Sequence, residues 1–310
     1  MATVSAPAAS RDIPRHLDVR TWTPTPRVGG RAVVLGGGGA TGIGWEAGIV
    51  QGLLDEGIDL READTLIGTS AGSVVAAHAR FGTDFEHGFE PIYTGEHQVP
   101  NGTFRAVDTL RFVVANLLPT GQAKRRALLG RASVRSARKG HLAPEEDWVA
   151  AIGERLVGQP WPAGDLLITA VDALTGTSVV FDRHSGVPLE RAMAASCAVP
   201  GIYPPVTING RPFVDGGVRT VTNVDLAAGH ERVVVIAPVP FAVRRSDRPQ
   251  EQAAALGDQV RSIVVHPDPA ALRAMGRDVL DLTRARAAAE AGRRQGVASA
   301  DKVRVVWDGA

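Results

Sequence analysis

Between residues 31 and 80, apolar and polar positions follow the order expected of an α/β protein. Short apolar runs at 31–35 and 64–67 have the length and composition of buried strands. The segments that follow them, 43–54 and 73–78, have the composition and spacing of helices. The order strand, glycine loop, helix, strand, tight turn, helix predicts a βαβα unit, which implies a parallel sheet with both faces covered.

Further elements are predicted along the rest of the chain. Asn209-Gly210 lies between two apolar runs, which is the strongest short signal for a tight hairpin. The predicted strands are 165–171, 178–182, 205–208, 211–214, 232–237, 262–265 and 303–307. The predicted helices are 107–118, 144–156, 187–197 and 269–294. This pattern shows no internal repeat, and it contains no linker that would divide the chain after residue 31.

The expected domain organisation is therefore simple. Residues 1–30 are rich in Pro, Ala and Thr and are expected to form a flexible N-terminal arm. Residues 31–310 are expected to form a single α/β domain, in which residues 84–143 are a candidate helical cap insertion. No stretch of the sequence approaches the 18 or so apolar residues of a membrane span, and the first 30 residues lack the apolar core of a signal peptide.

Composition narrows the class of partner and the compartment. The 310 residues are 44% hydrophobic and 22% charged with a net charge of +1, so nothing in the overall charge indicates a nucleic-acid partner. The single cysteine, Cys197, excludes an internal disulfide and is expected to be a small buried apolar residue. A reducing compartment fits this composition, and a cytoplasmic location is expected.

A candidate nucleophile lies in the turn after the second strand. The sequence Gly68-Thr69-Ser70-Ala71-Gly72 has the form Gly-x-Ser-x-Gly and joins a predicted strand to a predicted helix. Small flanking residues let the strand turn sharply, which exposes the serine at the end of a sheet. Such a serine needs an oxyanion site and a base.

The glycine loop after the first strand has two possible uses. Gly37-x-Gly39-x-x-Gly42 fits the dinucleotide-binding fingerprint, but the acidic residue Asp64 lies at the wrong end of the second strand for that role. The alternative is an oxyanion hole built from successive N–H groups at a helix N-terminus. Because adjacent parallel strands end side by side, the loop at Gly37 to Gly39 should lie beside Ser70. The sequence therefore favours the oxyanion hole.

The base could be a histidine or an aspartate. His230 and His266 follow in the order expected of a Ser-Asp-His triad, although His230 has the surroundings of an exposed loop residue. Asp215 ends a hairpin arm and precedes Gly216 and Gly217, which allow a close backbone approach. A turn would explain Asp-Gly on conformational grounds alone. In combination with the glycine loop and Ser70, a direct Ser–Asp dyad is the better interpretation.

These motifs together resemble the patatin-like phospholipase family. The resemblance rests on residues 37–42, on Gly68 to Gly72, on Asp215 with Gly216 and Gly217, and on residues 195–206. It implies a three-layer α/β/α fold with a mostly parallel central sheet and lipid acyl hydrolysis by a Ser–Asp dyad. By position, Ser70 would be the nucleophile, Asp215 the base, and Gly37, Gly38 and Gly39 the oxyanion donors, with no metal or cofactor.

The sequence departs from the family pattern in two places. Thr41 stands where the family usually has Arg or Lys, and Trp45-Glu46 replaces a more typical small or His-containing segment. Two alternatives therefore stay open, a Ser-His-Asp esterase and a non-catalytic fold that binds lipid or protein. The basic residues of 124–139 could contact anionic headgroups of a membrane surface, or they could form a solvated helix face.

Overall fold

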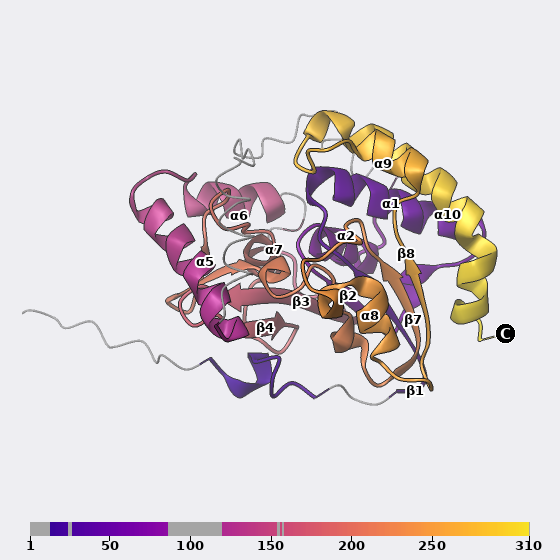
Figure 1. The fold of residues 1–310 in the computed structure, drawn as a ribbon, viewed down its shortest axis with the longest axis horizontal. Helices are drawn as coiled ribbons and strands as arrows, with labels where there is room; N and C mark the ends of the chain where they lie inside the picture. The colour runs from indigo at the N-terminus through magenta and orange to yellow at the C-terminus, as the bar shows by residue number, and fades with distance from the viewer. Residues whose placement is uncertain (1–12, 24–26, 86–119, 154–155, 157, 310) are drawn as a thin grey trace, which may run out of the picture.

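The structure is a computed structural model, and it describes residues 13–23, 27–85, 120–153, 156 and 158–309 (Figure 1). The strands are β1 Arg27–Leu35, β2 Thr65–Gly68, β3 Asp165–Asp172, β4 Ser178–Phe181, β5 Val206–Ile208, β6 Arg211–Asp215, β7 His230–Ile236 and β8 Arg261–Val265. The helices are α1 Gly39–Asp55, α2 Ala71–Arg80, α5 Gln122–Arg138, α6 Glu145–Gly153, α7 Leu189–Ser196, α8 Pro249–Ala254, α9 Pro269–Met275 and α10 Ala285–Trp307. The predicted helix at 107–118 lies outside the described residues.

One sheet carries all of these strands, in the order β5-β6-β3-β2-β1-β7-β8, with β4 also paired to β3. Strands β3, β2, β1, β7 and β8 are parallel, whereas β4, β5 and β6 are joined by antiparallel pairs. The central sheet is thus mostly parallel, as the sequence predicted. Strand β1 begins at Arg27, before the expected domain boundary, because Arg27 already pairs with His230.

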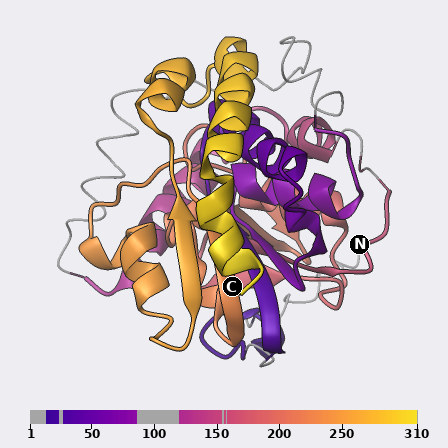
Figure 2. The same cartoon turned by 90° about the vertical axis from the view of Figure 1, so that its right-hand side faces the viewer.

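Helices cover both faces of the sheet (Figures 1 and 2). On one face, α1, α2, α7 and α10 enclose the larger core, which contains Trp45, Phe181 and Trp307. On the other face, α8 and the turn at 224–227 cover β1, β2 and β7, and α5 packs over β3 and β6. The α/β/α class predicted from the sequence is therefore confirmed, and the carboxyl ends of the parallel strands lie between these two helical layers.

The C-terminal region differs from the prediction. The predicted strand at 303–307 is wrong, because these residues belong to α10: Val303, Val306 and Trp307 are buried whereas Val305 is 55% exposed. This is helical spacing. The single helix expected at 269–294 is also wrong. It breaks at Gly276, whose φ of 77° is left-handed, and α10 begins only at Ala285.

A stripe of glycines brings α1 and α10 into close contact, and Figure 2 shows the two helices side by side. Gly44, Gly48 and Gly52 are spaced four residues apart in α1, and the carbonyl oxygens of Ala285, Ala289 and Arg293 lie where their Cβ atoms would be. Residues four apart lie on one face of a helix. The opposite face of α1 is therefore left to pack on the sheet.

Candidate active site

Ser70 occupies a strained turn between β2 and α2. Its φ of 52° and ψ of −122° are rare for a residue with a side chain, and α2 begins at the next residue, Ala71. A Cβ on Gly68 would overlap the backbone of Ser73, and one on Gly72 would overlap the Leu35 carbonyl. The two glycines predicted from the Gly-x-Ser-x-Gly motif are thus required for steric reasons.

The sheet directs Asp215 toward the end of β2. β4 occupies one edge of β3, and β2 and β6 share the other edge, since Ile168 pairs with Gly68 and Ala170 pairs with Asp215. β6 runs antiparallel to β3, whereas β2 runs parallel to it. The two strands on this edge therefore point toward each other head-on, and β6 ends at Asp215. Two residues along a strand span about 6–7 Å. The end of β6 therefore lies close to the turn that carries Ser70.

Burial gives the Asp215 carboxyl the properties of a base. It raises the pKa of Asp215 to about 7, and the nearby Ser70 hydroxyl and the Gly217 N–H offset this only in part. Oδ1 accepts a hydrogen bond from the Gly217 N–H at 2.6 Å. Oδ2 is buried and makes no hydrogen bond within the described part of the chain. The Ser70 hydroxyl nevertheless lies close enough to the Asp215 carboxyl group to affect its pKa.

The glycine loop lies beside Ser70. A Cβ on Gly37 would be 3.4 Å from the Ser70 Cβ, and one on Gly42 would be 3.7 Å from the Ala71 Cβ. The Gly37 N–H donates to the Val221 carbonyl at 2.8 Å and the Gly42 N–H donates to Gly38. Neither of these two N–H groups is free to bind an oxyanion. Of the oxyanion donors expected from the sequence, Gly37, Gly38 and Gly39, only Gly38 and Gly39 are left.

The N–H groups of Gly38 and Gly39 make no hydrogen bond within the residues that the structure describes. They lie at the N-terminus of α1, where the helix dipole adds a positive field. Gly39 has a left-handed φ of 61°, and a Cβ there would meet the Val279 carbonyl at 2.5 Å. Gly38 and Gly39 are thus the free donors that the loop offers.

Two polar residues of α1 that depart from the family pattern are buried next to this loop. Thr41 is fully buried, and its hydroxyl has no hydrogen-bond partner among the described residues. Glu46 is also fully buried, with both carboxyl oxygens equally unpartnered. Burial raises the pKa of Glu46 well above its usual range, and the nearby Gly36 backbone N–H opposes this. Burial therefore favours the neutral form of the Glu46 carboxyl group.

A network of buried hydroxyl groups supports the turn. The Ser70 N–H donates to Ser196 Oγ at 2.9 Å, so Ser196 at the end of α7 fixes the serine backbone. Beneath it, Thr169 donates to Thr69 Oγ1 at 2.9 Å, and Asn223 Nδ2 donates to the same oxygen at 3.0 Å. Thr69 and Ser196 belong to the motifs that carry the resemblance, but no local pattern marks Thr169 or Asn223.

Cys197 lies in the same cluster. Its Sγ is 3.7 Å from Ser73 Oγ, and the Ser73 hydroxyl donates to the Ser70 carbonyl at 2.7 Å. Burial raises the pKa of the Cys197 thiol, and the charge of Asp215 raises it further. Cys197 is therefore a buried neutral thiol, as predicted, but it packs against the candidate nucleophile.

The two candidate histidines make their described contacts away from Ser70 and Asp215. The expectation that His230 is an exposed loop residue is wrong: it begins β7, is 4% exposed, and its ring nitrogens contact Thr65 Oγ1 and the Ala227 carbonyl. His266 is exposed at the end of β8, and its Nδ1 lies 3.4 Å from the Pro267 carbonyl. The described contacts of both histidines are thus with groups other than Ser70 and Asp215.

The comparison with protein families agrees with this site. The family model described as patatin-like phospholipase matches residues 33–228, which include the glycine loop, Ser70 and Asp215. The chain belongs to the patatin-like phospholipase family. The resemblance inferred from the sequence is thereby confirmed.

Curated relatives and solved structures give more distant matches. Proteins named uncharacterized NTE family proteins, from Mycobacterium bovis and Mycobacterium tuberculosis, are 29% identical over 205 residues, which cover 66% of this chain and 46% of each relative. The chain thus spans about half the length of these relatives. VipD from Legionella pneumophila aligns with a TM-score of 0.44 and 15% identity, over 90% of this chain and 67% of that one.

Human GIVD cytosolic phospholipase A2, in complex with methyl gamma-linolenyl fluorophosphonate, also has a TM-score of 0.44, with 14% identity over 91% of this chain and 59% of that one.

Among the described residues, no helix has the length and apolar character needed to cross a membrane. The same residues contain no group of three His, Cys, Asp or Glu side chains that could hold a metal ion.

Proposed function

We propose that this chain is a lipid acyl hydrolase in which Ser70 and Asp215 form the catalytic dyad. The observation that carries the proposal is the head-on approach of β6 to β2, which brings a buried carboxylate near a strained serine. Membership of the patatin-like phospholipase family supports a lipid ester as substrate. Gly38 and Gly39 are the proposed oxyanion donors.

The proposed reaction needs only groups that the chain supplies. Asp215 removes the proton from Ser70 Oγ, which attacks the carbonyl carbon of the ester. The N–H groups of Gly38 and Gly39 bind the tetrahedral oxyanion, and its collapse releases the alcohol, which takes the proton from Asp215. Water then attacks the acyl-enzyme and gives a proton to Asp215. The fatty acid leaves, and Ser70 recovers its proton.

Covalent labelling tests this proposal. A long-chain alkyl fluorophosphonate should add one phosphonyl group to the wild-type protein at Ser70, detected by intact mass and peptide mapping. Ser70→Ala should not react. Ser73→Ala, which alters the neighbouring hydroxyl, is the matched control and should still be labelled. Labelling of Ser70→Ala at the same rate as wild type would contradict the proposal.

The two alternatives predict other outcomes of the same experiment. In a Ser-His-Asp esterase, His266→Ala or His230→Ala would abolish labelling, whereas the dyad predicts normal labelling of His266→Ala. A non-catalytic lipid-binding fold would leave the wild-type protein unlabelled. Thr41 in place of the family cation is the feature that favours the non-catalytic alternative, and its buried, unpartnered hydroxyl offers no replacement charge.

We also propose that the exposed side of α5 contacts anionic membrane surfaces. Lys124, Arg131, Arg135 and Arg138 are exposed on this helix, and Leu128 between them is 48% exposed. Basic residues around an apolar side chain suit a lipid interface. A cytoplasmic location remains a prediction from the sequence alone.

Vesicle sedimentation checks the membrane contact. Binding to vesicles that contain phosphatidylglycerol should exceed binding to pure phosphatidylcholine vesicles and should weaken as salt is raised. Replacing Arg131 and Arg135 by Gln should reduce the difference between the two lipids. Equal, salt-insensitive binding to both would show that this side of α5 is a solvated surface.

A further inference from the structure

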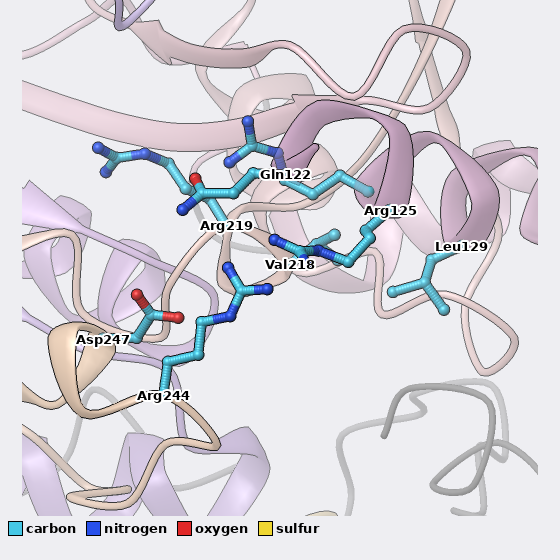
Figure 3. Close-up of a pocket in the computed structure, with 8 residues that line it drawn as sticks. Gln122, Arg125, Leu129, Val218, Arg219, Arg244 and Asp247 are labelled. Atoms are coloured by element: carbon cyan, nitrogen blue, oxygen red, sulfur yellow. The ribbon is translucent and has the colours of Figure 1, made fainter. Parts of the chain in front are cut away.

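A small basic hollow opens beside the turn that follows Asp215 (Figure 3). Three segments that are distant in the sequence line it: the start of α5, the residues after the short helical turn Gly216–Val218, and the turn Arg245–Asp247 with the residue before it. Its polar lining consists of Gln122, Arg125, Arg126, Arg219, Arg244 and Asp247. Four arginines therefore share this hollow with one carboxylate.

Arg126 has more positively charged than negatively charged side chains around it. Burial and the nearby cations Arg219, Arg20 and Arg125 lower the pKa of Arg126 to about 10, and Asp247 is the acid that opposes this. Arg126 Nε donates to the Gly176 carbonyl at 2.8 Å. Its terminal nitrogens make no hydrogen bond within the described residues, so they can donate to a ligand.

Arg219 is fixed in orientation. It donates to both carboxyl oxygens of Asp225, and its Nη1 also donates to Asn223 at 2.6 Å. Asn223 is itself part of the buried network under Ser70, through its bond to Thr69. The candidate active site therefore holds Arg219 in place as a wall of the hollow, but Asp225 balances its charge, so the attraction for an anion rests mainly on Arg126.

The hollow and the proposed base share one short turn. The Asp215 side chain caps the turn Gly216–Val218 by accepting from the Gly217 N–H, and Val218 and Arg219 line the hollow. Asp215 and the hollow are thus separated by a turn of only three residues. Guanidinium groups bind the oxygens of a phosphate in pairs, which suits a phosphate near a carboxyl ester.

We propose that this hollow binds a phosphate group, namely that of a lipid acyl ester whose carbonyl lies at Ser70. The chain would then prefer glycerophospholipids over uncharged glycerides. This assignment rests on the proposed function for its substrate, but the anion site itself can be tested without catalysis. The positive charges of this proposed site come from α5 and from the turns near 219 and 245. They do not come from position 41, where the family usually has Arg or Lys and this chain has Thr41.

Binding is measured first, in the Ser70→Ala background. Isothermal titration with glycerol 3-phosphate should show binding that Arg126→Gln weakens by about tenfold or more, as expected for a charge-assisted phosphate contact. Arg244→Gln is a second variant from another segment, in case Arg126→Gln does not fold. Arg294→Gln, exposed on α10, is the control and should bind as the parent does. No binding by the parent would overturn the proposal.

Hydrolysis then identifies the source of the phosphate. Soluble dihexanoyl phosphatidylglycerol and dihexanoylglycerol differ in the headgroup and avoid membrane docking. Arg126→Gln should lower the ratio of kcat/KM for the phospholipid to that for the glyceride by about tenfold, and Arg294→Gln should not. An unchanged ratio, with inorganic phosphate binding as tightly as glycerol 3-phosphate, would overturn the lipid assignment in favour of free phosphate.

The two proposals fail in different ways. If wild type binds glycerol 3-phosphate through Arg126 but neither hydrolyses ester nor reacts with a fluorophosphonate, the proposed function fails and the anion site is supported. If ester hydrolysis and labelling are normal but phosphate does not bind, the proposed function stands and the phosphate site is overturned.

Discussion

Asp215→Asn is expected to lower kcat for ester hydrolysis by about 10³-fold, within the range attributed to a positioned general base. The substitution suits the structure, because an asparagine Oδ1 can still accept the hydrogen bond from the Gly217 N–H that Asp215 accepts at 2.6 Å. What is lost is the carboxylate oxygen near Ser70. The turn should therefore keep its shape while Ser70 loses its proton acceptor.

The pH profile gives this prediction a second readout. Burial raises the pKa of Asp215 to about 7, and only the deprotonated form can act as a base. The kcat/KM of wild type should therefore rise with pH up to about 7 and level off above it. The residual activity of Asp215→Asn should not show this step, since the group that titrates has been removed. Rates are measured with a soluble ester from pH 5 to 9.

Folding stability supplies the control for this variant. Because the folded pKa of Asp215 lies above its ordinary value, the folded state holds a proton that the unfolded chain releases between about pH 4 and 7. The contribution of Asp215 to the free energy of unfolding thus falls as pH rises through that window. Asp215→Asn should remove this contribution and stay folded at pH 7. A folded Asp215→Asn variant with wild-type kcat would exclude Asp215 as the base.

The parts of the site that could be predicted from the sequence are those whose geometry depends on neighbouring residues in the chain. Ser70 lies in a turn that needs small residues at 68 and 72, so the turn leaves a readable motif. Asp215 was detectable because two glycines follow it, and Gly216 packs directly on Thr169. The order of strands and helices between 31 and 80 follows from the same local rules.

Features that depend on distant contacts could not be predicted. The burial of His230 depends on Thr65, which lies 165 residues away in the sequence. The head-on approach of β6 to β2 results from both strands pairing with one edge of β3. Glu46 belongs to a helix whose apolar spacing predicts burial of neighbours such as Ile49. That spacing gives no sign that a carboxyl group is buried among them without a hydrogen-bond partner.

The mistaken strand at 303–307 has a similar cause. A short apolar run is compatible with either a strand or a buried helix segment when it is seen alone. Here the run continues a helix, because the earlier part of α10, residues 285–297, packs on Gly44, Gly48 and Gly52 of α1. The contacts that place this helix therefore lie outside the run itself.

Gly48→Ala in α1 is expected to lower the free energy of unfolding by roughly 3 kcal/mol, at the upper end of the usual cost of overpacking. Helix propensity alone predicts the opposite sign, since alanine is favoured over glycine in a helix by about 1 kcal/mol. A Cβ on Gly48, however, would overlap the Ala289 carbonyl oxygen and crowd the Arg293 backbone nitrogen. Neither backbone group can move unless α10 shifts away from α1.

Gly121→Ala, at the N-cap of α5, is the control without a steric neighbour, because no atom lies within 4 Å of a Cβ there and its φ is −58°. Alanine is less favoured than glycine at an N-cap, so a loss of up to about 1 kcal/mol is expected there. Denaturant unfolding of the two variants compares the same substitution with and without a facing helix. Gly48→Ala should also expose α10 to limited proteolysis before the rest of the fold. If Gly48→Ala were as stable as wild type, the close packing of α10 on α1 would be contradicted. A much larger loss in Gly48→Ala than in Gly121→Ala would show that close contact with α1 holds α10 in place.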